Sequence, residues 1–428
     1  MHRARVDGTS GETVIACRDR VRAVLTVLVA WTSVVGAGVT WANAAGAAPG
    51  RDLRLGAATP VARGVEYRDF SLTASHGPAH GHLLTVDLGE PGVSLDLLYP
   101  GTVAARATVS RMVERSGAVG GVNGDFFNIT ETQHPGVEAT GAPVGPSIAR
   151  GNRLGAAVPD GQRFGPAMPQ GASTRDVIGL GTDGSARLDR LTLAGTVTAH
   201  GKKLTLRGLN QYAVPVGGIG AFTADWGTAS RKRATCGTDR DRSAPCSGDT
   251  YEVTVRRDRV ASVAERPGRG AIPAGSVVLV GRDAGAKELR KMRVGDTVRV
   301  EDRLESEERG ALRFAIGGFP VLRDGRPVAG LDDSTSAVRT SAGTGEDGRR
   351  FYLLALDGGS EYRSGMTVYE LAELMRDLGS DEAVNLDGGG SSTLATRDPG
   401  EERAKVRNHP SGGGERAVAN GIGVFFRN

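Results

Sequence analysis

Two aspartates that each follow a short apolar segment are the residues best placed to do chemistry. Residues 351–356 run into Asp357 and two glycines, and residues 382–386 run into Asp387, three glycines and two serines. A carboxylate at the end of a buried strand, beside glycines that leave the backbone open, is a common way to build a site on a rigid element. Single Asp-Gly pairs also make ordinary turns. Two such strand ends flanking one helix favour a site.

A third acidic strand end lies far upstream. Residues 122–125 read Val-Asn-Gly-Asp, and residues 384–387 read Val-Asn-Leu-Asp. A predicted helix that begins with Thr-Val precedes each copy, at residues 108 and 367. We interpret this pattern as an internal quasi-repeat of helix, strand and acidic end, which makes Asp125 the counterpart of Asp387. Four matching positions also arise by chance, and the hypothesis fails if the two strands lie in different domains.

The elements that must position these carboxylates show clear local signals. Thr367 can cap a helix with Glu370 in capping-box spacing, apolar residues follow at helical period, and Gly379 provides the stop. The Arg-Asp-Gly-Arg stretch at 323–326 predicts a hairpin turn. We therefore predict an α+β fold of mixed or antiparallel sheets packed with a few helices, with a β-rich middle subdomain or insertion at about 195–305.

Composition excludes several function classes. The 428 residues are 39% hydrophobic, contain 64 glycines and carry a net charge of +4 without a dense basic run. Abundant glycine favours turns and β structure over long bundles. Nucleic-acid binding is poorly supported.

The N-terminus carries the pattern of an export signal. Three arginines precede an apolar run over residues 23–39, and Ala-Asn-Ala at 42–44 fits a small-residue cleavage site. We predict a signal peptide over 1–44, with an uncleaved signal anchor as the alternative, and a linker over 45–62. The protein is then secreted or faces outside the cytoplasm, and contacts the membrane only if the segment stays uncleaved. In that oxidising setting Cys236 and Cys246 predict a loop-closing disulfide.

Residues 364–420 carry the clearest resemblance to a known family. These residues resemble the phosphodiester glycosidase domain. The resemblance rests on Asn-Leu-Asp-Gly-Gly-Gly-Ser-Ser-Thr at 385–393, on Ser-Gly at 364–365, and on Asn408, Pro410, Ser411, Glu415, Arg416 and Asn420. Residues 338–343 resemble the family's Pro-Arg-Thr-Ala segment, with Val338 at the proline position and Ser341 inserted. Residues 122–127 are similar to its early strand motif. The resemblance spans a domain over residues 63–428 and is loosest through the middle.

The resemblance implies hydrolysis of sugar-1-phosphate diesters, which releases the sugar and leaves a phosphate monoester, on cell-envelope or extracellular glycans. An oxocarbenium-like transition state needs carboxylates as nucleophile, base or electrostatic partner, and the candidates are Asp125, Asp357 and Asp387. Guanidinium, hydroxyl, amide and backbone groups would bind phosphate and sugar, and the expected substrate contacts are Asn123, Arg339, Thr340, Gly388, Gly389, Gly390, Ser391, Ser392 and Asn408. The alternative is a non-catalytic carbohydrate-binding or envelope-associated protein that uses the same pocket.

Other sites find less support in the residues. The glycine-serine stretch lacks the Gly-Lys-Ser/Thr ending of a phosphate-binding loop and the Gly-x-Ser-x-Gly of a serine hydrolase. His80 and His82 share a strand face without an evident carboxylate partner, so we predict a solvated strand edge there and no metal site. No cofactor is required, although clustered carboxylates could hold a divalent cation. Glu415 and Arg416 are expected to pair with each other.

Overall fold

The computed structural model describes residues 52–308, 310–358 and 365–427. The predicted signal segment at 1–44 lies outside these residues. None of the helices in the described ranges has the length and apolar character that a membrane crossing requires.

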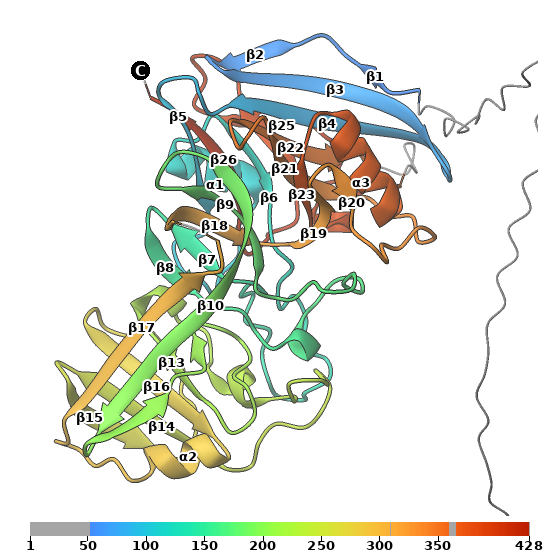
Figure 1. Cartoon of the computed structure of the whole chain (residues 1–428). Helices are drawn as coiled ribbons and strands as arrows, with labels where there is room; N and C mark the ends of the chain where they lie inside the picture. The colour runs from blue at the N-terminus through green and yellow to red at the C-terminus, as the bar shows by residue number, and fades with distance from the viewer. Residues whose placement is uncertain (1–51, 309, 359–364, 428) are drawn as a thin grey trace, which may run out of the picture. The chain divides into compact units, whose positions relative to one another are not determined.

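A nine-stranded sheet holds the strands that end at Asp357 and Asp387 (Figure 1). Its spatial order is β1 (Arg54–Leu55), β3 (Val65–Ala74), β4 (Gly77–Asp87), β22 (Arg350–Leu356), β21 (Thr340–Gly345), β23 (Glu382–Leu386), β19 (Phe319–Arg323) and β20 (Arg326–Pro327), with β2 (Thr59–Ala62) paired to β3. Helix α3 (Val368–Asp377) packs against β19, β20 and β23. The sheet therefore brings two acidic strand ends to either side of β21.

A five-stranded sheet holds the third acidic strand end. Its order is β25 (Ala404–Val406), β24 (Leu394–Arg397), β6 (Gly120–Asn123), β26 (Gly421–Phe426) and β5 (Val93–Leu98). Helix α1 (Val109–Ser116) packs on β24, β25 and β6, and Thr108 caps its start. The last strand of the chain, β26, thus lies beside β6 and orders the backbone that leads to Asp125.

Two further sheets carry the middle of the chain. One has the order β11 (Lys202–Thr205), β10 (Ala186–Ala199), β9 (Asp176–Gly181), β18 (Leu312–Gly317), β7 (Ser147–Ala149) and β8 (Asn152–Gly155), with β17 (Val298–Ser306) paired to β10. The other has the order β12 (Gly208–Leu209), β13 (Ile219–Phe222), β16 (Ser276–Arg282), β14 (Thr250–Arg256) and β15 (Arg259–Ala264), and helix α2 (Ala284–Leu289) packs on it. Short 3-10 turns fill the connections, namely η1 (Asp160–Gln162), η2 (Ala224–Trp226), η3 (Lys232–Thr235) and η4 (Gly389–Ser391).

Strand β10 is long and pairs with different strands along its length. Its first half pairs with β9 and its second half pairs with β17, so it runs from one sheet environment into the next (Figure 1). The residues beyond it build a hydrophobic cluster of their own from β13, β14, β16 and α2. Other residues of the expected middle segment at about 195–305, such as Phe222 and Trp226, join the main hydrophobic core instead.

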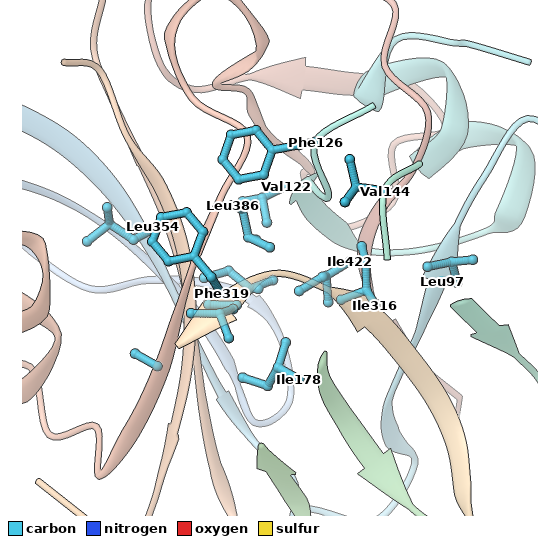
Figure 2. Close-up of a cluster of buried hydrophobic side chains, with 14 of the residues drawn as sticks. Leu97, Val122, Phe126, Val144, Ile178, Ile316, Phe319, Leu354, Leu386 and Ile422 are labelled. Atoms are coloured by element: carbon cyan, nitrogen blue, oxygen red, sulfur yellow. The ribbon is translucent and has the colours of Figure 1, made fainter. Parts of the chain in front are cut away.

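One hydrophobic core lies between the two sheets that carry the acidic strand ends. Leu354 and Leu386 come from the nine-stranded sheet, and Val122 and Ile422 come from the five-stranded sheet (Figure 2). All four are fully buried. Because burying such side chains stabilises a fold by about 1.5–3 kcal/mol each, this core holds β6 and β23 in a fixed relation.

Several local expectations are confirmed and some are corrected. Thr367 and Glu370 form the capping box, and the turn at Asp324 and Gly325 has both φ angles positive, as the predicted hairpin requires. The described chain is mostly β-sheet with few helices, so the α+β class fits only loosely. Residues 54–55 and 59–62, which composition assigned to a linker, form β1 and β2 because β3 offers them an open edge.

Candidate active site

The ends of β6 and β23 converge although they belong to different sheets. The Asp387 amide donates to the Gly124 carbonyl at 2.8 Å. Asn123 Nδ2 donates to the Asp387 carbonyl at 2.6 Å. These two bonds lock together backbones that are 264 residues apart in the chain. Asp125 and Asp387 consequently lie close together, and both strands belong to one compact unit, so the condition that would refute the quasi-repeat hypothesis is not met.

The Asp125 carboxyl is buried and easily protonated. Its side chain accepts from the Gly145 amide at 2.6 Å, and the residue is 3% exposed. Burial raises the pKa of Asp125 to about 7, although the Gly145 amide and the Arg163 charge oppose the rise; the charge of Asp387 adds to it. At neutral pH this carboxyl is therefore divided between its acid and its ionised form.

Asp387 is partly accessible, unlike Asp125. Burial raises the pKa of Asp387 to about 6, against a hydrogen bond from Ser391 and the positive charge of Arg416. Two interacting carboxyls with raised pKa values are typical of acid-base chemistry. The accessible one can meet a ligand in its ionised form while its neighbour keeps a proton.

Three of the expected substrate contacts are turned inward instead. Asn123 Oδ1 accepts from Thr340 Oγ1 at 3.0 Å and from the Thr393 amide at 2.9 Å. Thr340 Oγ1 shares a second hydrogen bond with Ser392 Oγ at 2.9 Å. All of these side chains are fully buried. Asn123, Thr340 and Ser392 were expected to touch substrate; in the structure their polar groups hold β6, β21 and the glycine-serine turn together.

Asn408 has a similar inward role. Its Oδ1 accepts from the Leu394 amide at 2.9 Å, and its Nδ2 donates to the carbonyls of Ser392 and Leu356 at 2.9 and 3.3 Å. It is 4% exposed. Asn408 thus ties the C-terminal loop to β22 and β24, and we assign it to positioning rather than to sugar recognition.

The glycine-serine turn offers fewer free amides than its sequence suggested. The Gly389 amide donates to the Val338 carbonyl at 2.8 Å, and the amides of Ser391 and Ser392 donate back to Gly388 and Gly389. Gly388, Gly389 and Gly390 remain partly accessible. Gly388 is required for close approach, because a Cβ there would lie 2.4 Å from the Val338 carbonyl oxygen. Three amides of the turn thus hold its own shape and its contact with Val338.

Arg416 is a site residue that sequence reasoning placed elsewhere. Its Nη1 donates to Ser391 Oγ at 3.2 Å, its charge opposes the pKa rise of Asp387, and the residue is exposed. The expected pair with Glu415 is wrong: Glu415 instead accepts from the Ser110 amide at 2.9 Å, at the start of α1. A carboxylate is stabilised there by the helix dipole, which leaves Arg416 to face Asp387.

Arg339 carries a buried charge near the start of β21. Its Nε and Nη2 donate to the carbonyls of Met366 and Thr335 at 2.9 and 2.8 Å, and the residue is 5% exposed. Among the described residues no carboxylate lies within ion-pairing distance of it. Burial lowers the pKa of Arg339, which the charge of Asp332 opposes.

Arg163 lies near Asp125, and no sequence motif identified it as a candidate site residue. Its guanidinium stands 5.6 Å from the Phe126 ring centroid and 5.8 Å from that of Phe319, and the two rings stack with centroids 6.0 Å apart. The stretch that contains Arg163 has little periodicity, so only the fold could place it. Cation–π contacts of this kind fix a guanidinium in position.

The predicted disulfide between Cys236 and Cys246 is present. The loop that it closes packs on the segment that carries Arg163: the Gly161 amide donates to the Asp239 carbonyl at 3.0 Å, and Arg242 Nη1 donates to the Arg163 carbonyl at 3.0 Å. The disulfide thus supports the backbone on which Arg163 is held.

Asp357 belongs to a separate group of side chains. It follows β22, and β21 separates it from Asp387, so the two backbones are roughly 10 Å apart at two strand spacings. Burial favours a higher pKa for Asp357, but hydrogen bonds from His82 and His409 hold its pKa below the usual value. His82 is buried on β4, which lies inside the sheet between β3 and β22. The predicted solvated edge is therefore wrong, because the carboxylate partner comes from a strand 275 residues away.

Part of the chain matches a known protein family. Residues 249–425 match the phosphodiester glycosidase family model, which covers Arg339, Asp357, Asp387 and Arg416 but not Asp125. No curated protein matches the chain.

Two solved structures share the fold. A hypothetical protein from Synechocystis is 22% identical with a TM-score of 0.67 over 87% of this chain and 64% of its own length. A protein from Burkholderia pseudomallei, described as exported, is 18% identical with a TM-score of 0.67 over 88% of this chain and 97% of its own. The chain therefore spans less than two thirds of the Synechocystis protein.

A third likeness is weaker. The catalytic domain of zebrafish N-acetylglucosamine-1-phosphodiester alpha-N-acetylglucosaminidase, auto-inhibited by its pro-peptide, is 14% identical over 88% of both chains, and its TM-score of 0.42 is too low to indicate a shared site. The family model is the stronger finding, and it confirms over residues 249–425 the resemblance of this chain to the phosphodiester glycosidases.

Proposed function

We propose that the protein is an exported hydrolase that cleaves sugar-1-phosphate diesters, releasing the sugar and leaving a phosphate monoester. The observation that carries this proposal is the interacting pair of Asp125 and Asp387, with pKa values raised to about 7 and about 6. The match of residues 249–425 to the phosphodiester glycosidase family supports the reaction class.

The two carboxyls would divide the work of glycoside cleavage. Asp387, accessible and the more readily ionised, stabilises the positive charge at the anomeric carbon, or attacks that carbon, as the bond to the phosphate oxygen breaks. Water then adds to the anomeric carbon, displacing Asp387 where a bond to it has formed, and the sugar is released. Asp125, buried and protonated below about pH 7, acts as a hydrogen-bond donor or acid beside it. A phosphate leaves with little protonation, so a strong general acid is not needed.

The phosphate needs positive charge, and two arginines are candidates to supply it. Arg416 is exposed and lies beside Asp387 through Ser391. Arg339 has no carboxylate partner among the described residues and is held by two carbonyls, so its charge stays available to an anion. Guanidinium groups bind phosphate in a two-point manner that lysine cannot reproduce.

Export is the second part of the proposal. It rests on the arginine-rich, apolar and small-residue pattern over residues 18–44 and on the Cys236–Cys246 disulfide, a bond that persists in oxidising compartments. Envelope or extracellular glycans are then the substrate class within reach.

The test offers purified protein a set of α- and β-linked hexose 1-phosphate methyl diesters and measures free sugar and methyl phosphate. Asp387→Asn and Asp125→Asn should each lower turnover by roughly 10²–10⁴-fold, as loss of an acid-base group does. Arg416→Ala should mainly raise KM. The matched controls Asp377→Asn on α3 and Arg403→Ala, both exposed, should behave as the unmodified protein.

Two outcomes would count against the proposal. Undiminished turnover in the site variants would refute the residue assignment while leaving the reaction standing. Glycan binding without turnover of any diester would favour the non-catalytic binding protein instead.

A further inference from the structure

Three side chains from distant parts of the chain converge beside the proposed site without being part of it. His82 Nε2 lies 3.1 Å from Asp357 Oδ1, and His409 Nδ1 lies 3.1 Å from the same oxygen. The three atoms all lie within 4.8 Å of one another. His82 comes from β4, Asp357 follows β22, and His409 comes from the loop before β26.

The two nitrogen–oxygen separations of 3.1 Å fit a metal-ligand set. A zinc ion with bonds of about 2.0–2.1 Å in tetrahedral geometry places its ligand atoms roughly 3.3 Å apart. Two imidazoles and one carboxylate are a donor set that suits zinc and its transition-metal neighbours, whereas calcium and magnesium prefer oxygen alone. Chemistry and spacing therefore point to the same class of ion.

The surroundings supply what a metal-binding histidine needs. Tyr67 Oη is 2.8 Å from His82 Nδ1, and the two rings stack with centroids 5.9 Å apart at 11°. Arg407 lies over the Tyr67 ring at 4.9 Å and holds it in turn. A partner on the second ring nitrogen fixes the tautomer and directs the first toward the metal.

Access to this group is from one side. The side chains of His82 and Asp357 are 9% and 5% exposed, while that of His409 is 52% exposed. Of the three side chains, that of His409 is the one that reaches the surface, so an ion would enter past it.

A metal-free arrangement would crowd a single oxygen. Asp357 Oδ1 receives both imidazoles and also the His409 amide at 2.6 Å. Among the described residues no hydrogen bond reaches Oδ2. An ion between the two rings and the carboxylate would replace two of these contacts with bonds to one centre.

We propose that His82, Asp357 and His409 bind a divalent transition metal of the zinc type, which fastens the C-terminal loop to the middle of β4 and to the end of β22. The site goes beyond the proposed hydrolase function and does not depend on it. It also differs from a carboxylate-only calcium or magnesium site, since two of its three ligands are imidazoles.

The experiment uses protein purified with a tag that contains no histidine, treated with EDTA and dialysed. Calorimetric titration with ZnCl₂ should show one ion bound with a Kd below about 10 µM. Thermal unfolding of the zinc-loaded protein should show a higher midpoint than that of the metal-free protein. His409→Ala should weaken binding by at least about 10-fold and abolish the thermal shift, since it removes one of three ligands. CaCl₂ should produce neither effect.

The control is His200→Ala, because His200 is an exposed histidine in the middle of the chain that pairs with Asp296. It should bind zinc as the unmodified protein does. Absence of saturable zinc binding, equal binding by His409→Ala, or equal binding of calcium would each overturn the proposal. The readout is ion binding without substrate, so these outcomes are distinguishable from failure of the hydrolase assay.

Discussion

Replacing Asp125 with asparagine should stabilise the fold while it removes activity, and the gain should grow with pH. In the folded protein burial raises the pKa of Asp125 from 3.8 to about 7. Between these two values the folded state holds a proton that the unfolded state has lost. Stability of the unmodified protein therefore falls as pH rises from about 4 to about 7 and is constant above that. Asparagine does not ionise, so the variant does not lose this stability.

The magnitude follows from the pKa difference. At about 1.4 kcal/mol per pKa unit, the raised pKa of Asp125 lowers the stability of the folded protein, relative to its value at low pH, by about 2 kcal/mol at pH 5 and about 4 kcal/mol at pH 8. The asparagine carbonyl can still accept from the Gly145 amide, which donates to the carboxyl at 2.6 Å in the unmodified protein. We therefore expect the stability difference between variant and unmodified protein to rise by about 2–3 kcal/mol between these two pH values.

Urea unfolding at both pH values measures this difference. Asp183→Asn is a suitable control, because a hydrogen bond from the Ser185 amide lowers the pKa of Asp183, the opposite direction to that of Asp125, so its effect should not grow between the two pH values. A stability difference for Asp125→Asn that is equal at both pH values, or that shrinks at the higher one, would refute the reasoning. It would mean that the carboxyl is hydrated or paired rather than desolvated.

Three further outcomes are expected. The pH–rate profile of hydrolysis should be bell-shaped with apparent pKa values near 6 and 7, because Asp387 must be ionised while its buried partner stays protonated; a flat profile across that range would contradict the assignment. Gly388→Ala should lose about 1–3 kcal/mol of stability in thermal unfolding, because its Cβ would lie 2.4 Å from a backbone carbonyl oxygen, whereas Gly412→Ala meets nothing within 4 Å and should be neutral. Replacing Cys236 and Cys246 together by serine should lower the free energy of unfolding, measured in urea, by about 2–3 kcal/mol, as expected for a crosslink across 10 residues. An unchanged free energy would show that the loop is ordered without the bond.

Sequence alone determined the features that depend on near neighbours. The capping box at Thr367 and Glu370, the hairpin turn at Asp324 and Gly325, and the acidic ends of β6 and β23 all follow from residues a few positions apart. Turn, cap and period signals act over such distances, so they can be read without knowing the fold.

Tertiary structure alone decided what each polar side chain contacts. Asn123 and Asn408 have the same chemistry whether they bind sugar or bind backbone, and only the packing of the strands shows that their groups are used internally. His82 had no carboxylate partner in its own stretch because Asp357 reaches it from a strand far along the chain. The raised pKa of Asp125 has the same origin, since burial by distant segments sets it.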